Sequence, residues 1–196
     1  MAAFWFRFEA DGITAVVIEF DGKAVVLNPE PVVATTLVGL LGPAMEPVNM
    51  VNAAAVASSN GIAVSTVRHD RQCDYETLLR VSISHKSSDR TIAGTLVGGN
   101  KLRIVEVQHI AVGSDFPRHL LYLRNYDKPG LVGDLGSLFG KHGINIATLH
   151  LGRREAGGEA IALVEIDGGL PKTMLPEIRA LDQVVRADAL HFALDI

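Results

Sequence analysis

The stretch RNYDKPGLVGDLGSLFGKHGINIA, from Arg124 to Ala147, decides the fold, because a strand end, a turn, a helix and the entry to another strand follow one another in it. Pro129 has the fixed backbone angle of a first helical turn, and several glycines follow it. Glycine-rich turns into helices often bind phosphate. The stretch therefore raises the question whether it binds a phosphate-containing ligand, in addition to indicating the fold.

The spacing of these glycines argues against a nucleotide site. A dinucleotide fingerprint needs G-x-G-x-x-G in a parallel βαβ unit, and a P-loop ends in G-K-S or G-K-T, whereas Gly140-Lys141 is followed by His142. Gly133, Gly136 and Gly140 instead share one face of the helix. Each costs roughly 0.5–1 kcal/mol relative to alanine, so together they indicate close packing against a sheet or a neighbouring chain.

The region around this stretch predicts a complete small domain. In chain order we expect a strand, a helix, two strands, a helix and a strand, at residues 119–126, 130–142, 144–153, 159–167, 171–181 and 184–194. This βαββαβ order is the ferredoxin-like arrangement, with four antiparallel strands and two helices on one face.

The first half of the chain predicts a separate α/β domain. Alternating β-branched residues at 13–20 and 24–27, around the turn signal at Asp21-Gly22, indicate a hairpin. Helices are expected at 29–42 and 53–60, and a run of antiparallel strands between residues 62 and 112. Turn residues gather at 113–118, so we expect an α+β protein with domains at 1–115 and 116–196.

Composition excludes several classes of protein. The chain of 196 residues is 48% hydrophobic and 20% charged, with a net charge of −4 and no basic stripe, so nucleic acid is not expected as a partner. Cys73 is the only cysteine, and the seven histidines lack metal-ligand spacing, so no metal site is expected. Neither a signal peptide nor an apolar run of roughly 20 residues is present, so we expect a cytoplasmic protein without membrane contact. Nucleophilic catalysis has no local signature.

The helix start offers complements for both charges of an amino acid. The amides of Gly130, Leu131 and Val132 lack helical partners and suit a carboxylate, while Asp127 just before them suits an ammonium group. Asn125 and Asn145 add amide groups that donate and accept. On the residues alone, a structural alternative stays open, in which Asp127 caps the helix and Asn145 makes a turn.

The segment NYDKPGLVGDLGSLFGKHGINIATLHLGR, continued by GGEAIALVEIDGGLP, resembles an ACT domain of the D-3-phosphoglycerate dehydrogenase family. The segments VNMVNAAAVASSNGIAV, DYETLLRVSI and AGTLVGGNKLRIVEV resemble the intervening domain of the long form of that enzyme. Together they cover the chain from about Ile13 to its end. The family's pattern varies at the position of Asn125.

The resemblance implies a role and a set of residues. In the family, ACT domains bind L-serine, the end product, for feedback inhibition and associate with one another; Asn125, Asp127, Gly130, Leu131 and Val132 would contact serine, and Asn145 would reach it from a paired subunit. For the intervening domain, the resemblance implies an anionic ligand. The residues that suit such an anion are Asn49, Asn52, Lys101 and Arg103.

The chain lacks room for the family's NAD-binding and substrate domains, so we expect no catalysis and no cofactor in the chain itself, with NAD bound by catalytic domains of a parent enzyme that would be its partners. We favour a regulatory fragment over a free-standing sensor. The alternatives are an oligomerisation module without a ligand and the regulatory region of an L-serine dehydratase.

Overall fold

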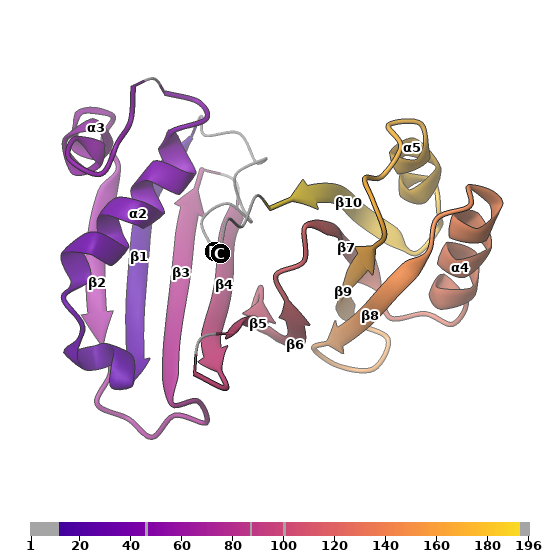
Figure 1. The fold of residues 1–196 in the computed structure, drawn as a ribbon, viewed down its shortest axis with the longest axis horizontal. Coiled ribbons are helices and arrows are strands. Elements are labelled where there is room, and N and C mark those ends of the chain that lie inside the picture. The colour runs from indigo at the N-terminus through magenta and orange to yellow at the C-terminus, as the bar shows by residue number, and fades with distance from the viewer. Residues whose placement is uncertain (1–11, 46, 87, 100, 193–196) are drawn as a thin grey trace. The chain divides into compact units, whose positions relative to one another are not determined.

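The computed structural model describes residues 12–45, 47–86, 88–99 and 101–192 (Figure 1). The chain forms two compact units, Met1–Arg103 and Ile104–Ile196, and the predicted boundary at residue 115 falls inside the second. Residues 1–11, for which no signal peptide is expected, and residues 193–194 of the last predicted strand lie outside the described residues. In the described part of the chain, no helix has the length and apolar character needed to cross a membrane.

The elements follow the chain in this order. The first unit contains β1 (Ile13–Gly22), the 3-10 helix η1 (Lys23–Val26), α2 (Pro29–Leu41), α3 (Ala53–Ser59), β2 (Ala63–Arg68), β3 (Thr77–His85) and β4 (Ser88–Val97). After β5 (Lys101–Val107), which spans the division, come β6 (Ile110–Asp115), β7 (His119–Tyr126), α4 (Leu131–Lys141), β8 (Ile146–Arg153), β9 (Glu159–Ile166), α5 (Met174–Arg179) and β10 (Val184–His191).

A six-stranded sheet has the order β2-β1-β3-β4-β5-β6. The predicted antiparallel run is confirmed for β3 and β4, but β2 lies parallel to β1, which pairs antiparallel with β3 on its other side. The predicted hairpin at 13–27 is wrong. Residues 23–26 form the 3-10 helix, because β1 finds its partners far along the chain and the turn at Gly22 leads away from it.

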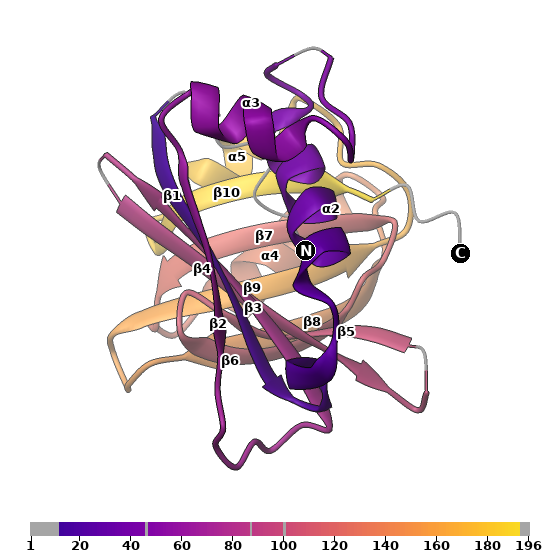
Figure 2. The same ribbon diagram turned by 90° about the vertical axis from the view of Figure 1, so that its left-hand side faces the viewer.

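Helix α2 begins and ends as its sequence predicts. The Asn28 side chain accepts from the amide of Glu30 at 3.2 Å, Pro29 occupies the first position, and Gly42 follows the last residue. Leu37 and Leu41 are fully buried. Figures 1 and 2 show α2 and α3 next to each other beside β1 and β2, so these helices lie over one face of the sheet near its β2 edge.

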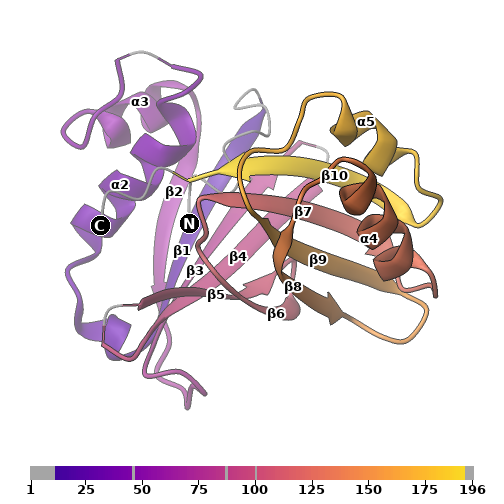
Figure 3. The same cartoon turned by 45° about the vertical axis from the view of Figure 1, so that its right-hand side comes forward.

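The second unit has the predicted ferredoxin-like order. Its four-stranded antiparallel sheet runs β10-β7-β9-β8, and α4 and α5 lie together on one face (Figure 3). The core between the sheet and the helices includes Leu121, Leu123, Leu135, Phe139 and Ile178. Because β8 ends the sheet order, one of its edges is unpaired within the described chain.

The glycines of α4 face away from this core. Among the described residues, a Cβ built on Gly133, Gly136 or Gly140 would meet nothing within 4 Å, so none of them serves close packing against the sheet of its own unit. That part of the prediction is wrong, and packing against a neighbouring chain remains as its alternative. Gly143 has a different role, since its φ of 66° ends the helix in a turn in which Ile144 donates to Phe139.

Candidate functional site

A cavity of about 400 Å³ opens in the second unit where β7, α4 and β8 meet. Its volume falls within the range of about 300–1,000 Å³ typical of small-molecule sites. The lining residues are Asn125, Asp127, Lys128, Pro129, Gly130, Leu131, Val132, Gly133, Leu151, Gly152, Arg153 and Ala160. The structure therefore brings together five of the six residues predicted for this site and leaves out Asn145.

The helix start supplies hydrogen-bond donors to the cavity. Gly130 has a φ of 108°, which glycine adopts without strain, and Asp134 is the first amide to bond back within the helix, to the carbonyl of Gly130 at 2.9 Å. The amides of Leu131, Val132 and Gly133 thus have no partner inside α4. With the positive end of the helix dipole, they suit a carboxylate.

Asn125 supplies an acceptor. Its side chain is 3% exposed, and its Nδ2 donates to the carbonyl of Tyr126 at 3.0 Å. The Oδ1 atom is buried and has no hydrogen-bond partner among the described residues. An unsatisfied buried acceptor costs about 1–3 kcal/mol, so such an atom in the wall of a cavity indicates a ligand that donates to it.

Asp127 forms hydrogen bonds that hold the turn between β8 and β9. Its Oδ2 accepts from Arg153 Nη1 at 2.7 Å and from the amide of Gly157 at 3.1 Å, and its own amide donates to Gly158 at 2.9 Å. The Gly157 amide and the Arg153 guanidinium hold the pKa of the Asp127 carboxyl below its ordinary value of 3.8. The carboxylate makes no bond that caps α4, so the capping alternative from the sequence is excluded.

Asn145 lies at the other end of β8 from the cavity. It precedes Ile146, and its Nδ2 donates to Asp167 Oδ2 at 2.7 Å. It does not line the cavity of its own chain. Any contact between Asn145 and a ligand there has to come from another copy of the chain.

The residues predicted for an anion in the first unit do not come together. Asn49 and Asn52 order the loop before α3, where Asn52 Oδ1 accepts from the Asn49 amide at 2.8 Å. Helix α3 packs on β2 at one edge of the sheet. Lys101 and Arg103 lie on β5, four strands away in the sheet order, so the expected grouping is not found.

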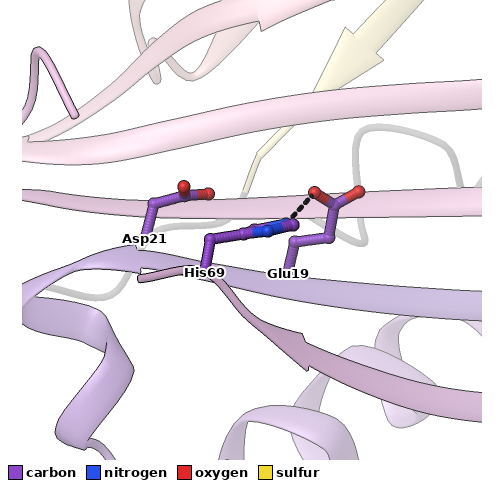
Figure 4. A group of neighbouring side chains, drawn as sticks. All are labelled: Glu19, Asp21 and His69. Atoms are coloured by element: carbon purple, nitrogen blue, oxygen red, sulfur yellow. Dashed lines mark hydrogen bonds and ion pairs between the residues drawn. The ribbon is translucent and has the colours of Figure 1, made fainter. Parts of the chain in front are cut away.

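A cluster of possible metal ligands, which sequence reasoning missed, lies in the first unit. Glu19 and Asp21 project from β1 beside His69, with one ligand atom of each within 4.8 Å of the others (Figure 4). Arg71 donates to both oxygens of the buried Asp21, at 2.6 and 3.2 Å, while His69 and Arg80 contact Glu19 at 2.8 and 3.4 Å. Because two guanidinium groups already neutralise both carboxylates, the cluster is better suited to joining strands than to holding a cation.

Four cavity residues on β8 and β9 were also missed. Leu151, Gly152 and Arg153 come from the end of β8, and Ala160 from the start of β9. Arg153 pairs with Ala160 across the two strands. A usable signal was present, because Arg153 is the one lysine, arginine, aspartate or glutamate in IATLHLGR and stands at the strand end before a glycine-rich turn.

Two family profiles match this chain. The profile of the D-3-phosphoglycerate dehydrogenase intervening domain matches residues 1–108, more than half of the chain, and that of the ACT domain matches residues 119–183. The unit that contains the cavity is thus the one that matches the ACT domain.

Curated relatives agree with the profiles. D-3-phosphoglycerate dehydrogenase of Synechocystis sp. is 32% identical over 152 residues, 77% of this chain and 27% of the relative. The enzyme of that name from Bacillus subtilis is 30% identical over 171 residues, 87% of this chain and 33% of the relative. The chain spans about a third of the length of these dehydrogenases. A probable L-serine dehydratase beta chain of Bacillus subtilis is 20% identical over 131 residues, 67% of this chain and 60% of the relative.

Proposed function

The chain belongs to the D-3-phosphoglycerate dehydrogenase family, whose intervening and ACT domains it carries as a C-terminal regulatory region, and from this we propose that it binds L-serine in the ACT domain for feedback inhibition. The parent enzyme would be an NAD-dependent dehydrogenase of L-serine biosynthesis. Its catalytic domains would be the partners that respond to the bound amino acid.

The observation that carries this proposal is the unpaired Oδ1 of Asn125 beside the free amides of α4. An α-amino acid supplies what both lack, because its ammonium or hydroxyl group donates and its carboxylate accepts. Asp127 adds a negative charge at the same cavity. The name of the dehydratase relative also includes L-serine, which supports this amino acid as the ligand.

We place the complete site between two copies of the chain. The free edge of β8 can pair antiparallel with the same edge of a second copy, in an isologous two-fold contact. A pairing centred on Leu149 sets Asn145 of one copy opposite Arg153 of the other, next to the cavity. The exposed glycines of α4 would let the paired helices approach closely.

Regulation would follow from a difference in affinity. If two arrangements of the subunits bind serine unequally, serine shifts the population toward the arrangement with the better site. Catalytic domains joined to that arrangement would then lose activity. A ligand that bound both arrangements equally would have no effect.

In the intervening domain we retain a narrower proposal. Lys101 and Arg103 would attract an anionic substrate or effector from β5. Asn49 and Asn52 would order their own loop instead of contacting this anion. Replacing both cations with glutamine should then remove binding of 3-phosphoglycerate, measured by calorimetry.

Calorimetric titration of L-serine into the chain tests the main proposal. We expect binding by the parent chain and none by Asn125→Val, which introduces a β-branched side chain that suits a strand but lacks the acceptor. The fold and the dimer are checked first by circular dichroism and sedimentation. If a folded dimer gives no heat and no thermal shift at millimolar serine, the proposal is refuted. That result would support an oligomerisation module without a ligand.

A further inference from the structure

We propose that Arg153 competes with the ligand's ammonium group for Asp127 and, once displaced, pairs with the ligand's carboxylate. The cavity would then select zwitterions over amines and over carboxylic acids. This inference rests on the proposed function, since it concerns the same cavity. It adds a specificity-determining residue that the sequence did not single out.

The first step is that Arg153 and Asp127 face one another within the cavity wall. Both line the cavity, and Arg153 Nη1 lies 2.7 Å from Asp127 Oδ2. Among the described residues, Asp127 is the one polar partner of the Arg153 side chain. Release from Asp127 therefore leaves the guanidinium without a partner unless a ligand supplies one.

The second step is that separating Arg153 from Asp127 requires little free energy. The side chains of Arg153 and Asp127 are 59% and 30% exposed. Exposed ion pairs contribute little to stability, because water screens them and holding two long side chains in one geometry costs entropy. Asp127 also keeps its bond from the Gly157 amide, so the turn remains attached when Arg153 leaves.

The third step concerns charge. An ammonium group at Asp127 would put two cations on one carboxylate while Arg153 stays, and like charges at that separation repel. A zwitterion resolves this repulsion, because its carboxylate accepts from Arg153 and from the amides of Leu131 and Val132. An amine leaves Arg153 unpaired, and a hydroxy acid leaves the ammonium position empty.

The test compares L-serine, ethanolamine and 3-hydroxypropionate, which are a zwitterion, an amine and a carboxylate that each carry one hydroxyl group. Affinities are measured by calorimetry for the parent chain, Arg153→Met and Arg153→Lys. Arg154→Met is the matched control, because the neighbouring Arg154 donates to the carbonyl of Gln108 at 3.2 Å and does not line the cavity.

In Arg153→Met we expect the affinity for ethanolamine relative to L-serine to rise about tenfold, the size of one charge-assisted hydrogen bond. Binding of 3-hydroxypropionate should weaken. Arg153→Lys and Arg154→Met should keep the parent's preference for the zwitterion. An unchanged ratio in Arg153→Met, or the same shift in Arg154→Met, overturns the role of Arg153. If the folded parent chain binds none of the three ligands, the proposed function itself fails.

Discussion

Gly152 on β8 packs directly against the carbonyl oxygen of Ala111 on β6. A Cβ on Gly152 would overlap that oxygen and would lie 3.0 Å from Ile110 Cγ2. We expect Gly152→Ala to lower the free energy of unfolding by about 1–3 kcal/mol, as overpacking does. Urea denaturation measures it. A loss smaller than that of Ala147→Gly, which removes an exposed methyl group from the same strand, would contradict the contact.

Replacing Gly136 with alanine is expected to raise the stability of the single chain, unlike the same change at Gly152. Because nothing lies within 4 Å of its missing Cβ, Gly136→Ala should stabilise the single chain by roughly 0.5–1 kcal/mol. The same methyl group should weaken the dimer if paired helices meet at this face. Sedimentation at several concentrations separates the two effects, and a dimer of unchanged strength would rule out α4 as part of the contact.

The contribution of the Asp127 carboxylate to the stability of the fold should depend on pH. Its pKa is lowered in the fold by Gly157 and Arg153, so its stabilisation is present above the ordinary value of 3.8 and is lost as pH falls through the lower folded value. Asp127→Ala should therefore be less stable than the parent chain near neutral pH and equal to it in strong acid. Hydrogen exchange at Gly157 should quicken in the variant. Equal melting temperatures of the parent chain and Asp127→Ala at pH 7 would show that the hydrogen bonds of Asp127 do not stabilise the fold.

The cross-strand pair of His119 and His191 should also make the folded protein less stable as pH falls. Their Nδ1 atoms lie 3.3 Å apart, and burial, then His191 and Arg118, lower the pKa of His119 below its ordinary value of 6.5. The unfolded chain thus takes up a proton first, so stability should fall as pH drops below 6.5. His191→Gln should flatten this slope in melting curves recorded from pH 7.5 to 5. A slope as steep as the parent's would exclude the pair as its source.

A site shared between subunits predicts complementation. Asn125→Val and Asn145→Ala should each abolish serine binding as homodimers, whereas a mixed dimer contains one site with both asparagines intact. Dimers purified through two different tags should then bind half as much serine per chain as the parent dimer. Full binding by the Asn145→Ala homodimer would show that the site belongs to one chain.

The second half of the fold was predictable because its signals are local. Pro129 and Gly130 start α4, Gly143 ends it, and strand periodicity marks β7 to β10. In the first half, the strand at 13–20 was found but its partner was not. The turn signal at Asp21-Gly22 fits several turn geometries, and the pairing of β1 with β3 depends on residues about 60 positions away.

The site was predictable to the extent that it lies on one turn. Asn125, Asp127 and the first residues of α4 are close in sequence, so their common location followed from the helix start. Arg153 reaches the cavity through the register of β8 and β9, and Glu19 meets His69 through a parallel pairing. Such contacts depend on strand partners that no short pattern specifies.

By itself, the sequence determined the family, the βαββαβ order and a helix start with donors for a carboxylate, because each follows from neighbouring residues. Only the tertiary structure decided that Asp127 is engaged by Arg153, that Asn125 holds the unpaired acceptor, and that the glycines of α4 face outward. The physical reason is that hydrogen-bond satisfaction and steric contact are properties of atoms brought together by folding, and distant strands supply many of those atoms.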